Sequence, residues 1–226
     1  MPNELSRRPN VPEGTVTRLC DYLRVLTMME RRGQPKASSV DIGQWAGVKA
    51  SQVRKDLSYF GEFGRRGLGY EVAKLRMHIQ DILGVRRQRP TVVIGAGNLG
   101  SALARYPGFG AHGFQIVGIY DNYPARIGHR LGNMKIRSTR ELPDDVRALR
   151  AEIAILTVPE HAAQETADYV ISTGIKAIVN FAPVLLNVPS NVNLRNVDLA
   201  RELETLCFYL PVETDAGDED DGEDNE

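Results

Sequence analysis

The sequence predicts an α/β protein in which an N-terminal winged helix-turn-helix domain precedes a Rossmann-like, doubly wound parallel sheet domain. Residues 12–84 carry apolar side chains at helical spacing, interrupted by glycines. From residue 91 onward, short apolar runs alternate with helical stretches, as in parallel sheets covered by helices. The expected divisions are a winged-helix domain at 1–85, a linker at 86–90, a Rossmann domain at 91–197, a C-terminal helix at 198–212 and a disordered acidic tail at 213–226.

Charge divides the chain in a similar way. Residues 1–89 hold 17 Lys and Arg against 9 Asp and Glu, whereas residues 90–212 hold 11 of each kind. Residues 213–226 hold 9 acidic residues and no basic ones, so the net charge is only -1. A basic first domain predicts a polyanionic partner, such as double-stranded DNA, for that domain alone.

Composition also limits the class of protein. No run of about 18 apolar residues occurs, so no membrane partner is expected, and residues 1–10 lack the apolar core of a secretory signal. Cys20 and Cys207 are far from other metal-ligating side chains, so we expect two packed, reduced thiols and no metal site. These features favour a cytoplasmic protein.

The first domain is expected to begin with an amphipathic helix over residues 12–32. Pro12 can start this helix, and Gly33 and Pro35 end it. Its apolar stripe comprises Val16, Leu19, Cys20, Leu23 and Leu26. A stripe of this kind packs against other helices of a small domain.

Two short helices separated by glycine follow. Ser38 or Ser39 can cap a helix that runs through Ala46, Gly47 breaks it, and a third helix spans residues 50–60. Helix, glycine turn and second helix form the helix-turn-helix pattern. Four glycines within residues 61–69 then favour a tight hairpin, or wing, before a helix over 72–83.

The third helix and the wing are the expected DNA-binding surface. Val53, Leu57 and Phe60 share one helix face, which leaves polar and basic side chains on the opposite face. Gln and Arg can hydrogen-bond to base edges, Lys, Ser and Tyr suit phosphates, and arginines at a wing tip suit a narrow minor groove. A solvated basic face is the alternative, disfavoured by the accompanying wing. The expected DNA-binding residues are Ser51, Gln52, Arg54, Lys55, Ser58, Tyr59, Arg65 and Arg66.

The second domain is expected to contain a parallel sheet. The continuous apolar run of residues 91–94 is typical of a strand that is buried on both faces. Further strands are predicted at 115–120, 153–158, 177–180 and 193–197, with helices at 159–172 and 198–209. The last helix has an apolar stripe of Leu199, Leu203, Leu206 and Leu210.

The loop after the first strand fits the dinucleotide-binding motif G-x-G-x-x-G. Gly95 allows a tight turn, Gly97 lets backbone N–H groups approach a pyrophosphate, and Gly100 lets the helix pack closely on the strand. Asp121 follows the next strand, 21 residues after Gly100, where a carboxylate can bind ribose hydroxyls. This favours NAD(H) over NADP(H), although Arg126 lies close to Asp121 in sequence and weakens the preference. The alternative for Asp121 is an ordinary turn residue at a strand end.

Several strings of residues together carry a family resemblance. Residues 52–61, Gln-Val-Arg-Lys-Asp-Leu-Ser-Tyr-Phe-Gly, run into Gly-Leu-Gly-Tyr at 67–70. Others are Tyr-Pro-Gly-Phe at 106–109, Leu-Thr-Val-Pro at 156–159 and Asn-Phe-Ala-Pro at 180–183. Over residues 12–210 the chain is similar to the Rex family of redox-sensing transcriptional repressors.

The resemblance implies a homodimer in which the C-terminal helix, here about 198–209, is domain-swapped and inserts between the two domains of the partner subunit. It implies binding to palindromic operator DNA, release when NADH accumulates relative to NAD+, and no catalytic residues. NADH and NAD+ would then be regulatory ligands. The cofactor-binding residues implied are Gly95, Ala96, Gly97, Asn98, Leu99, Gly100, Tyr106, Asp121, Thr157, Val158, Pro159, Asn180, Phe181, Ala182 and Pro183.

Some of these residues have more specific implied roles. The segment 180–183 would lie near the nicotinamide, and Tyr106 would lie near it at the subunit interface. Arg24 and Asp198 look like a family pair that rearranges between the two states. The alternative is that both are ordinary surface charges and that Asp198 caps its own helix.

Two features depart from the family pattern. Lys49 stands where relatives commonly have Ser or Thr at the start of the third helix, so the cap is expected to be weaker and a phosphate contact added. The acidic tail is additional, and it either competes with DNA for the basic surface or only solvates the chain.

Two other classes of function remain open at this point. A small NAD-dependent oxidoreductase would need an acid or base near the nicotinamide, and His161 is the best candidate. A histidine near the start of a solvent-facing helix is, however, more often an ordinary surface residue. A regulator of the same architecture could bind a CoA derivative, which Asp121 disfavours because a carboxylate there favours a free ribose diol.

Overall fold

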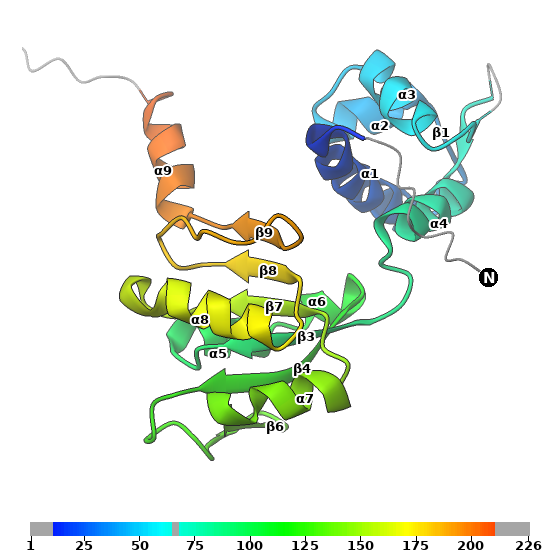
Figure 1. Ribbon diagram of the computed structural model, residues 1–226. Coiled ribbons are helices and arrows are strands. Elements are labelled where there is room, and N and C mark those ends of the chain that lie inside the picture. The colour runs from blue at the N-terminus through cyan, green and yellow to red at the C-terminus, as the bar shows by residue number, and fades with distance from the viewer. Residues whose placement is uncertain (1–10, 65–67, 211–226) are drawn as a thin grey trace, which may run out of the picture. The chain divides into compact units, whose positions relative to one another are not determined.

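The computed structural model describes residues 11–64 and 68–210, which form two compact units (Figure 1). The helical unit comprises residues 11–90 together with 106–116, and the sheet unit comprises 91–105 and 117–210. Arg65, Arg66 and the predicted acidic tail lie outside the described residues, so the predictions for them remain predictions.

The helical unit has the predicted succession of helices. Its elements are α1 (Glu13–Arg31), β1 (Lys36–Ala37), α2 (Ser39–Ala46), α3 (Ala50–Ser58), β2 (Tyr70–Glu71), α4 (Val72–Leu83) and α6 (Gly108–Ala111). The bounds of α4 are those predicted, and α3 ends two residues earlier than expected. Helices α2 and α3 form the helix-turn-helix.

Local capping explains where α2 begins and ends. The Ser38 hydroxyl accepts a hydrogen bond from the Asp41 backbone N–H, and the Asp41 carboxylate accepts one from the Ser38 backbone N–H. These reciprocal bonds form a capping box, and they lower the pKa of the Asp41 carboxyl. At the other end Gly47 adopts the left-handed conformation with φ 69°, which only glycine adopts without strain. The chain is thereby turned into α3.

The described residues of the glycine-rich segment, 61–64 and 68–69, do not pair with one another as the strands of a hairpin. Its end, β2, pairs antiparallel with β1, which precedes the helix-turn-helix, and Ala37 faces Tyr70 in this pairing. A two-stranded ribbon therefore brackets α2 and α3. The sequence signal for β1 is weak because a two-residue strand has no measurable alternation.

The core of the helical unit differs from the predicted apolar stripe of α1. Leu19 and Leu26 are fully buried as expected, but Val16 and Cys20 are exposed. Thr15 and Tyr22 take their place on the buried face. Two polar side chains can replace apolar ones here because both bind a buried carboxylate.

That carboxylate belongs to Asp56 of α3, which is completely buried. Arg18 donates through Nε at 2.6 Å and Nη2 at 2.7 Å to its two oxygens. The hydroxyls of Thr15 and Tyr22 donate at 3.0 and 2.7 Å, and the Gln52 amide donates at 2.8 Å. The network joins α1 to α3 and fixes the position of α3 in the helical unit.

The network also determines the ionisation of Asp56. Burial alone would raise the pKa of this carboxyl, but its hydrogen-bond donors outweigh burial and hold the pKa at about 2. Burial, together with the hydrogen bond to Asp56, raises the pKa of the Tyr22 hydroxyl. Because the folded-state pKa lies below the ordinary value of 3.8, the carboxylate stabilises the folded state above about pH 4. That stabilisation is lost as the pH falls towards 2.

The only tryptophan of the sequence, Trp45, is half exposed on α2. The guanidinium of Arg32, just after α1, lies 5.0 Å from the centre of its ring. This cation–π contact fixes the indole against the end of α1.

The sheet unit contains a seven-stranded, mostly parallel sheet with strand order β5-β6-β4-β3-β7-β8-β9. Its strands are β3 (Arg89–Ile94), β4 (Phe114–Asp121), β5 (Arg130–Leu131), β6 (Met134–Ser138), β7 (Ile153–Leu156), β8 (Ala177–Asn180) and β9 (Asn193–Asn196). Its helices are α5 (Asn98–Ala104), α7 (Leu142–Ala148), α8 (Glu160–Ser172) and α9 (Leu199–Cys207), with a 3₁₀ turn, η2 (Thr139–Glu141). The doubly wound parallel sheet confirms the predicted fold class.

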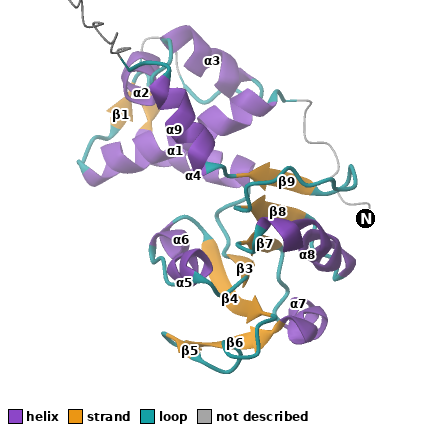
Figure 2. Ribbon diagram, turned by 90° about the vertical axis from the view of Figure 1, so that its left-hand side faces the viewer, coloured by secondary structure: helices purple, strands orange, loops and turns teal. Residues whose placement is uncertain are grey.

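Helices cover both faces of this sheet. Figure 2 shows α5 on one side of the strands and α7 and α8 on the other. The central strands are accordingly apolar on both faces, with Val92, Val93 and Ile94 buried. The sequence did not predict β5 and β6, because residues 130–138 are polar and belong to a sheet edge.

The last helix, α9, presents its apolar residues to solvent within this chain. Leu199, Leu203 and Leu206 are each more than 60% exposed. Cys20 and Cys207 are exposed as well, so the expectation of packed thiols was wrong for the single chain. An apolar stripe of this kind normally marks a surface that another chain covers.

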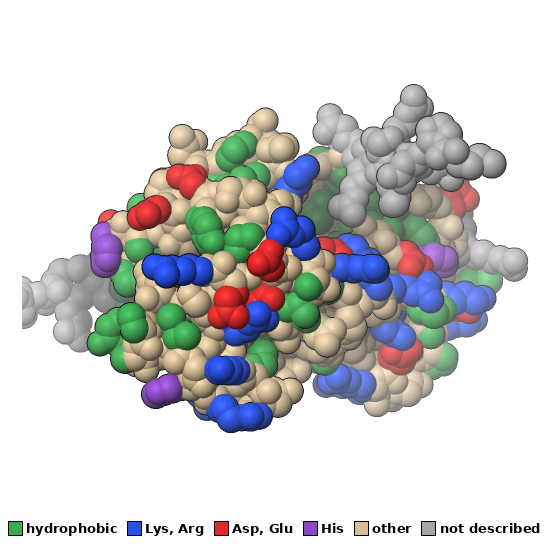
Figure 3. Space-filling view, turned by 60° about the horizontal axis from the view of Figure 1, so that its bottom comes forward, with side chains coloured by type: hydrophobic (Ala, Val, Ile, Leu, Met, Phe, Trp, Pro, Cys, Tyr) green, Lys and Arg blue, Asp and Glu red, His purple; other side chains and the backbone are tan. Residues whose placement is uncertain are grey.

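Charged side chains of both signs lie together on part of the surface. Figure 3 shows acidic and basic side chains interleaved on the face that it presents. Examples of such pairing are Arg137 with Glu141 and Arg147 with Asp144. No helix in the described part of the chain is both long and apolar enough to span a membrane.

The Asp56 network yields a prediction for stability. Replacing Asp56 by Ala leaves Arg18 without its partner and buried donors unsatisfied, so we expect a loss of about 3–5 kcal/mol in the free energy of unfolding. Urea denaturation followed by circular dichroism measures this loss. Asp21→Ala is the control, because its exposed pair with Arg24 spans 3.8 Å, and it should cost less than about 0.5 kcal/mol. Equal stability of the two variants would contradict the assigned role.

Candidate functional site

The glycine-rich loop between β3 and α5 is held from the β4 side by backbone and carboxylate contacts. The Gly95 N–H donates to the Tyr120 carbonyl oxygen at 2.8 Å. The Ala96 N–H donates to Oδ2 of Asp121 at 2.7 Å. These two contacts fix the loop to the end of β4.

Thr157 holds the same loop from the β7 side. Its hydroxyl donates to the carbonyl oxygens of Ile94 and Gly95 at 3.1 and 2.8 Å. Its own backbone N–H donates to the Ile94 carbonyl at 2.9 Å. The sequence predicted Thr157 as a residue beside the cofactor, and the structure adds that it supports the glycine loop.

The space around the three motif glycines differs. A Cβ on Gly100 would lie 1.9 Å from the Gly95 carbonyl oxygen, and one on Gly95 would lie 2.6 Å from the Thr157 carbonyl oxygen. A Cβ on Gly97 would meet nothing within 4 Å. Gly95 and Gly100 are thus required by packing, whereas Gly97 faces open space above the loop.

That open space is a pocket of about 800 Å³ at the carboxyl end of the parallel strands. This volume lies within the range of small-molecule and cofactor sites. Eight of the predicted cofactor residues line it: Gly95, Gly97, Asn98, Leu99, Asp121, Thr157, Val158 and Pro159. It lies at the carboxyl end of β3, between the loops that follow β4 and β7. The strand order reverses between β3 and β7, and such a reversal is the usual ligand position in doubly wound sheets.

Asp121 lies in this pocket, but most of its carboxylate is occupied. The side chain is 4% exposed. Besides the Ala96 contact, its Oδ1 accepts a hydrogen bond from the Tyr123 N–H at 2.7 Å, and Arg126 lies 3.2 Å from Oδ2. The predicted ribose acid is therefore also a support for the loops on either side of it.

Other predicted cofactor residues do not line the pocket: Ala96, Gly100, Tyr106, Asn180, Phe181, Ala182 and Pro183. Asn180 is fully buried, and its amide nitrogen donates to the carbonyl oxygens of Ala182 and Val184. Its role in the structure is to shape the turn after β8. Tyr106 is largely exposed and packs edge-on against Phe109 in the helical unit.

Sequence reasoning missed several pocket residues. They are Ile94, Asn122, Tyr123, Arg126 as a lining residue, Thr139, Arg140, Ala162, Glu165, Thr166 and Tyr169. Thr139 and Arg140 follow β6, a strand that the sequence did not reveal. The Tyr169 hydroxyl donates to the Thr139 carbonyl oxygen at 3.1 Å, a contact between segments 30 residues apart.

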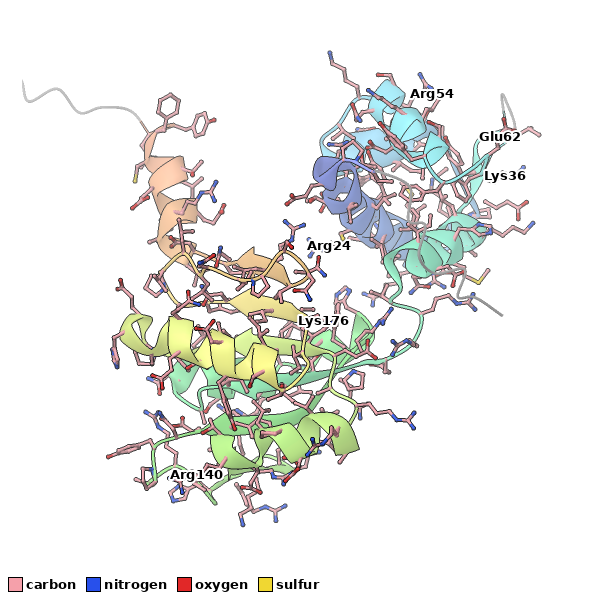
Figure 4. The ribbon with its side chains drawn as sticks, viewed as in Figure 1. Arg24, Lys36, Arg54, Glu62, Arg140 and Lys176 are labelled. Carbon is pink, nitrogen blue, oxygen red and sulfur yellow. The ribbon has the colours of Figure 1, made fainter. Side chains whose placement is uncertain are left out.

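The second predicted site is the outer face of α3. Ser51, Arg54, Lys55, Ser58 and Tyr59 are exposed and recur at helical spacing, so they form one surface. Figure 4 shows Arg54 on the outside of the helical unit. The described residues therefore retain a polar and basic face suited to a nucleic acid.

The side chains of Gln52 and Arg54 both make hydrogen bonds within the chain that the sequence did not predict. Gln52 is half-buried and directs its amide nitrogen to Asp56. Nη1 of Arg54 donates to the Ser39 hydroxyl at 2.8 Å, which ties α3 to the start of α2. Lys49 precedes α3 without a side-chain cap, as its sequence predicted.

Arg24 and Asp198 have local partners in this structure. Nη1 of Arg24 lies 3.8 Å from Asp21, one turn earlier on α1. Asp198 accepts hydrogen bonds from the backbone N–H groups of Ala200 and Arg201, which caps α9. Among the described residues, no group of three or more His, Cys, Asp or Glu side chains could hold a metal ion.

Comparison with known proteins covers both units. The family model described as a CoA binding domain matches residues 86–184, and that described as a putative DNA-binding protein N-terminus matches residues 10–58. The redox-sensing transcriptional repressor Rex of Pelotomaculum thermopropionicum is 48% identical over 200 residues, which cover 88% of this chain and 94% of the relative. That of Thermus thermophilus is 46% identical with the same two coverages.

The chain belongs to the Rex family. The relatives named here are transcriptional repressors. The family is therefore one of regulators and not of enzymes, as the sequence analysis predicted for this chain. A crystal structure of RSP, a Rex-family repressor, with NAD+ and operator DNA matches with a TM-score of 0.84 and 37% identity, covering 89% of this chain and 93% of RSP. RSP with NADH matches with a TM-score of 0.81 and 36% identity, covering 89% and 95%.

The glycine loop yields a paired prediction for nucleotide binding. Gly97→Ala meets no neighbour, so we expect unchanged stability but at least about tenfold weaker NADH binding, because the methyl group would obstruct the pyrophosphate. Gly100→Ala collides with the Gly95 carbonyl, so it should also lower the melting temperature. Calorimetric titration and thermal unfolding of both variants test this. Full NADH affinity in Gly97→Ala would be inconsistent with a pyrophosphate over this loop.

Proposed function

We propose that this chain is a transcriptional repressor that binds palindromic operator DNA as a homodimer and releases it when NADH accumulates relative to NAD+. Its gene targets would then follow the cellular NADH/NAD+ ratio. The observation that carries the proposal is a pocket beside the loop at residues 95–100 in a chain whose helix α3 also exposes a polar and basic face. A regulator of chromosomal genes would act in the cytoplasm.

Each part of the chain has a role in this proposal. Residues 1–85 would bind DNA, 91–197 would bind the nucleotide, and 198–212 would join the subunits, with 86–90 as the linker. The pyrophosphate would lie over Gly97 and the first turn of α5, and the adenosine ribose near Asp121. Solved Rex-family complexes with NADH and with NAD+ and operator DNA support these assignments.

Redox preference follows from the charge of the nicotinamide ring. NADH has a neutral ring, whereas the NAD+ ring is cationic, so an apolar environment buries the reduced form at lower cost. Phe181, Ala182, Pro183 and Tyr106 are the residues that would provide it, with Asn180 shaping the turn that carries three of them. No proton or hydride transfer is needed for such a preference.

DNA binding would use the outer face of α3. Arg54 would contact base edges, and Ser51, Lys55, Ser58, Tyr59 and Lys49 would contact phosphates. Gln52 would act at the edge of this surface, since Asp56 holds one of its amide hydrogens. Arg65 and Arg66 would contact the minor groove. Two such helices in a dimer would match half-sites that lie a whole number of turns apart, each turn about 34–36 Å.

The homodimer would be formed through α9. Its leucine stripe is exposed within the single chain and would be covered by the partner subunit after a domain swap. Arg24 and Asp198 would pair across subunits in one state and return to their local partners in the other.

Operator binding tests the proposed regulation directly. With purified protein and a palindromic operator fragment, saturating NADH should weaken DNA binding strongly, whereas saturating NAD+ should not. By linkage, operator DNA must weaken NADH binding by the same factor. A switch from 99:1 to 1:99 needs about 10⁴-fold differential affinity. Equal DNA affinity in NADH and NAD+ would disprove the regulation, and tighter binding of CoA than of NADH would favour the CoA alternative.

The role of α9 is tested by its central leucine. Leu203→Asp places a charge in the middle of the exposed stripe, so we expect a monomer in sedimentation velocity and loss of operator binding. Glu204→Gln on the same helix is the matched control and should remain dimeric. A dimeric Leu203→Asp variant would show that α9 does not form the interface.

A further inference from the structure

The outer face of α3 presents cations that have no acidic partner among the residues that the structure describes. Lys49, Arg54 and Lys55 are all exposed, and none of them forms an ion pair there. The only acidic residue of α3 is Asp56, which is fully buried and bound to Arg18. The face therefore carries an uncompensated positive charge that an anion from elsewhere can bind.

Exposed cations on α4 and just after it differ in this respect. Nζ of Lys74 lies 2.8 Å from the carboxylate of Glu71. Nη1 of Arg86 lies 3.0 Å from the carboxylate of Asp81. The helical unit thus supplies local carboxylates to some of its surface cations, whereas those of α3 are left to an external anion.

The sequence carries a polyanion shortly after α9. The acidic tail, residues 213–226, holds nine Asp and Glu and no Lys or Arg, and six of its acids fall within the seven residues 218–224. An extended chain rises about 3.3–3.6 Å per residue, so these six carboxylates would follow one another about every 4 Å. One strand of DNA carries a phosphate about every 3.4 Å. The tail therefore approaches the linear charge density of a DNA strand.

The tail is long enough to reach α3 in the dimer proposed above. The described chain passes through α9 to Leu210, and residues 211–226 could span at most about 53–58 Å. In that dimer α9 packs between the two domains of the partner subunit, so the tail would start beside a helical unit. A domain of about 100 residues has a radius of gyration of about 13 Å, and the helical unit is of that size. The segment could therefore reach any part of its surface.

We propose that the acidic tail binds the basic face of α3 and competes with DNA for it. The contact is autoinhibitory, because the carboxylates occupy the cations that phosphates would otherwise contact. This inference rests on the proposed function, since DNA is the ligand that the tail displaces. DNA of any sequence needs the same cations, so the tail lowers the affinity for operator and for unrelated DNA by the same factor.

The size of the effect follows from the tether. A short tether gives an effective concentration of the order of 1 mM. A tail contact with a dissociation constant of about 0.2 mM, weaker than most non-specific DNA binding, would then occupy the face most of the time. DNA binding would be weakened by about fivefold.

Neutralising the tail in the full chain tests the competition. The variant has six substitutions that remove charge and keep length: Asp218→Asn, Glu219→Gln, Asp220→Asn, Asp221→Asn, Glu223→Gln and Asp224→Asn. We expect it to bind operator and unrelated duplexes about fivefold more tightly than the wild-type chain at about 50 mM salt, as measured by fluorescence anisotropy. The difference should shrink as salt is raised to about 300 mM, because screening weakens the tail contact.

A matched variant controls for the substitutions themselves. Exchanging Asp for Glu and Glu for Asp at the same six positions keeps the charge, so this chain should bind DNA as the wild type does. Both variants retain α9 and should be dimers in sedimentation velocity.

Carbodiimide cross-linking locates the contact, because it joins only carboxylates and amines that touch. Mass spectrometry should find tail carboxylates joined to Lys49 and Lys55, and operator DNA should suppress these cross-links. The exposed amines of Lys74, Lys135 and Lys176 are the controls and should couple to the tail far less. This distinguishes binding at α3 from a general repulsion between the tail and DNA.

The two measurements separate failure of the contact from failure of the proposed function. Unchanged DNA affinity of the neutral variant, or cross-links spread evenly over all five lysines, would overturn the tail contact. NADH would still release the protein from its operator in that case, so the proposed function would stand. If no form of the chain binds operator DNA, the proposed function and the competition fall together.

Discussion

The close approach of the glycine loop to β7 is the constraint on which the sheet unit depends. The loop can lie against Thr157 only because Gly95 and Gly100 have no side chains, and it stays there through the Thr157 hydroxyl and the Asp121 carboxylate. This places α5, the end of β4 and the start of α8 around one pocket.

Both units use a buried or nearly buried aspartate to fix a functional segment. Asp56 joins α1 to α3 through side-chain donors, and Asp121 joins the glycine loop to the turn after β4 through backbone N–H groups. In each case the carboxylate is paired with an arginine, which limits the cost of burying its charge. A residue that sequence motifs mark as ligand-binding can therefore owe its identity in part to the fold.

Sequence periodicity predicted the elements that have strong local patterns. Helix α2 has a capping serine and an ending glycine, and the strand at 91–94 is apolar because both of its faces are buried. The G-x-G-x-x-G loop has its glycines because close packing leaves no room for side chains at two of them. The short strands β5 and β6 have no such pattern, because edge strands are polar and brief. Arg140 could not be assigned to the pocket without the register of β6 on β4.

Two other differences have tertiary causes. Gln52 was expected to face DNA, but its amide nitrogen donates to the Asp56 carboxylate one turn later on α3. Asp56 can be buried because side chains of α1 supply hydrogen-bond donors to it. Asn180 was expected beside the cofactor, and its amide nitrogen also donates to the Asn196 side chain of β9 and to carbonyl oxygens of the turn at 180–184. Hydrophobic spacing on one helix or strand carries no information about such partners from other elements. The family resemblance supplied a role for Asn180, but it did not supply the contacts of this residue.

The position of Trp45 has a practical consequence. The chain has one tryptophan, so all indole emission originates on α2, next to the turn that leads into α3. Because the ring is partly exposed and stacked with Arg32, its quantum yield and its quenching by iodide will respond to changes at the end of α1. The natural chain thus contains a built-in optical probe of the helix-turn-helix, and no dye has to be attached.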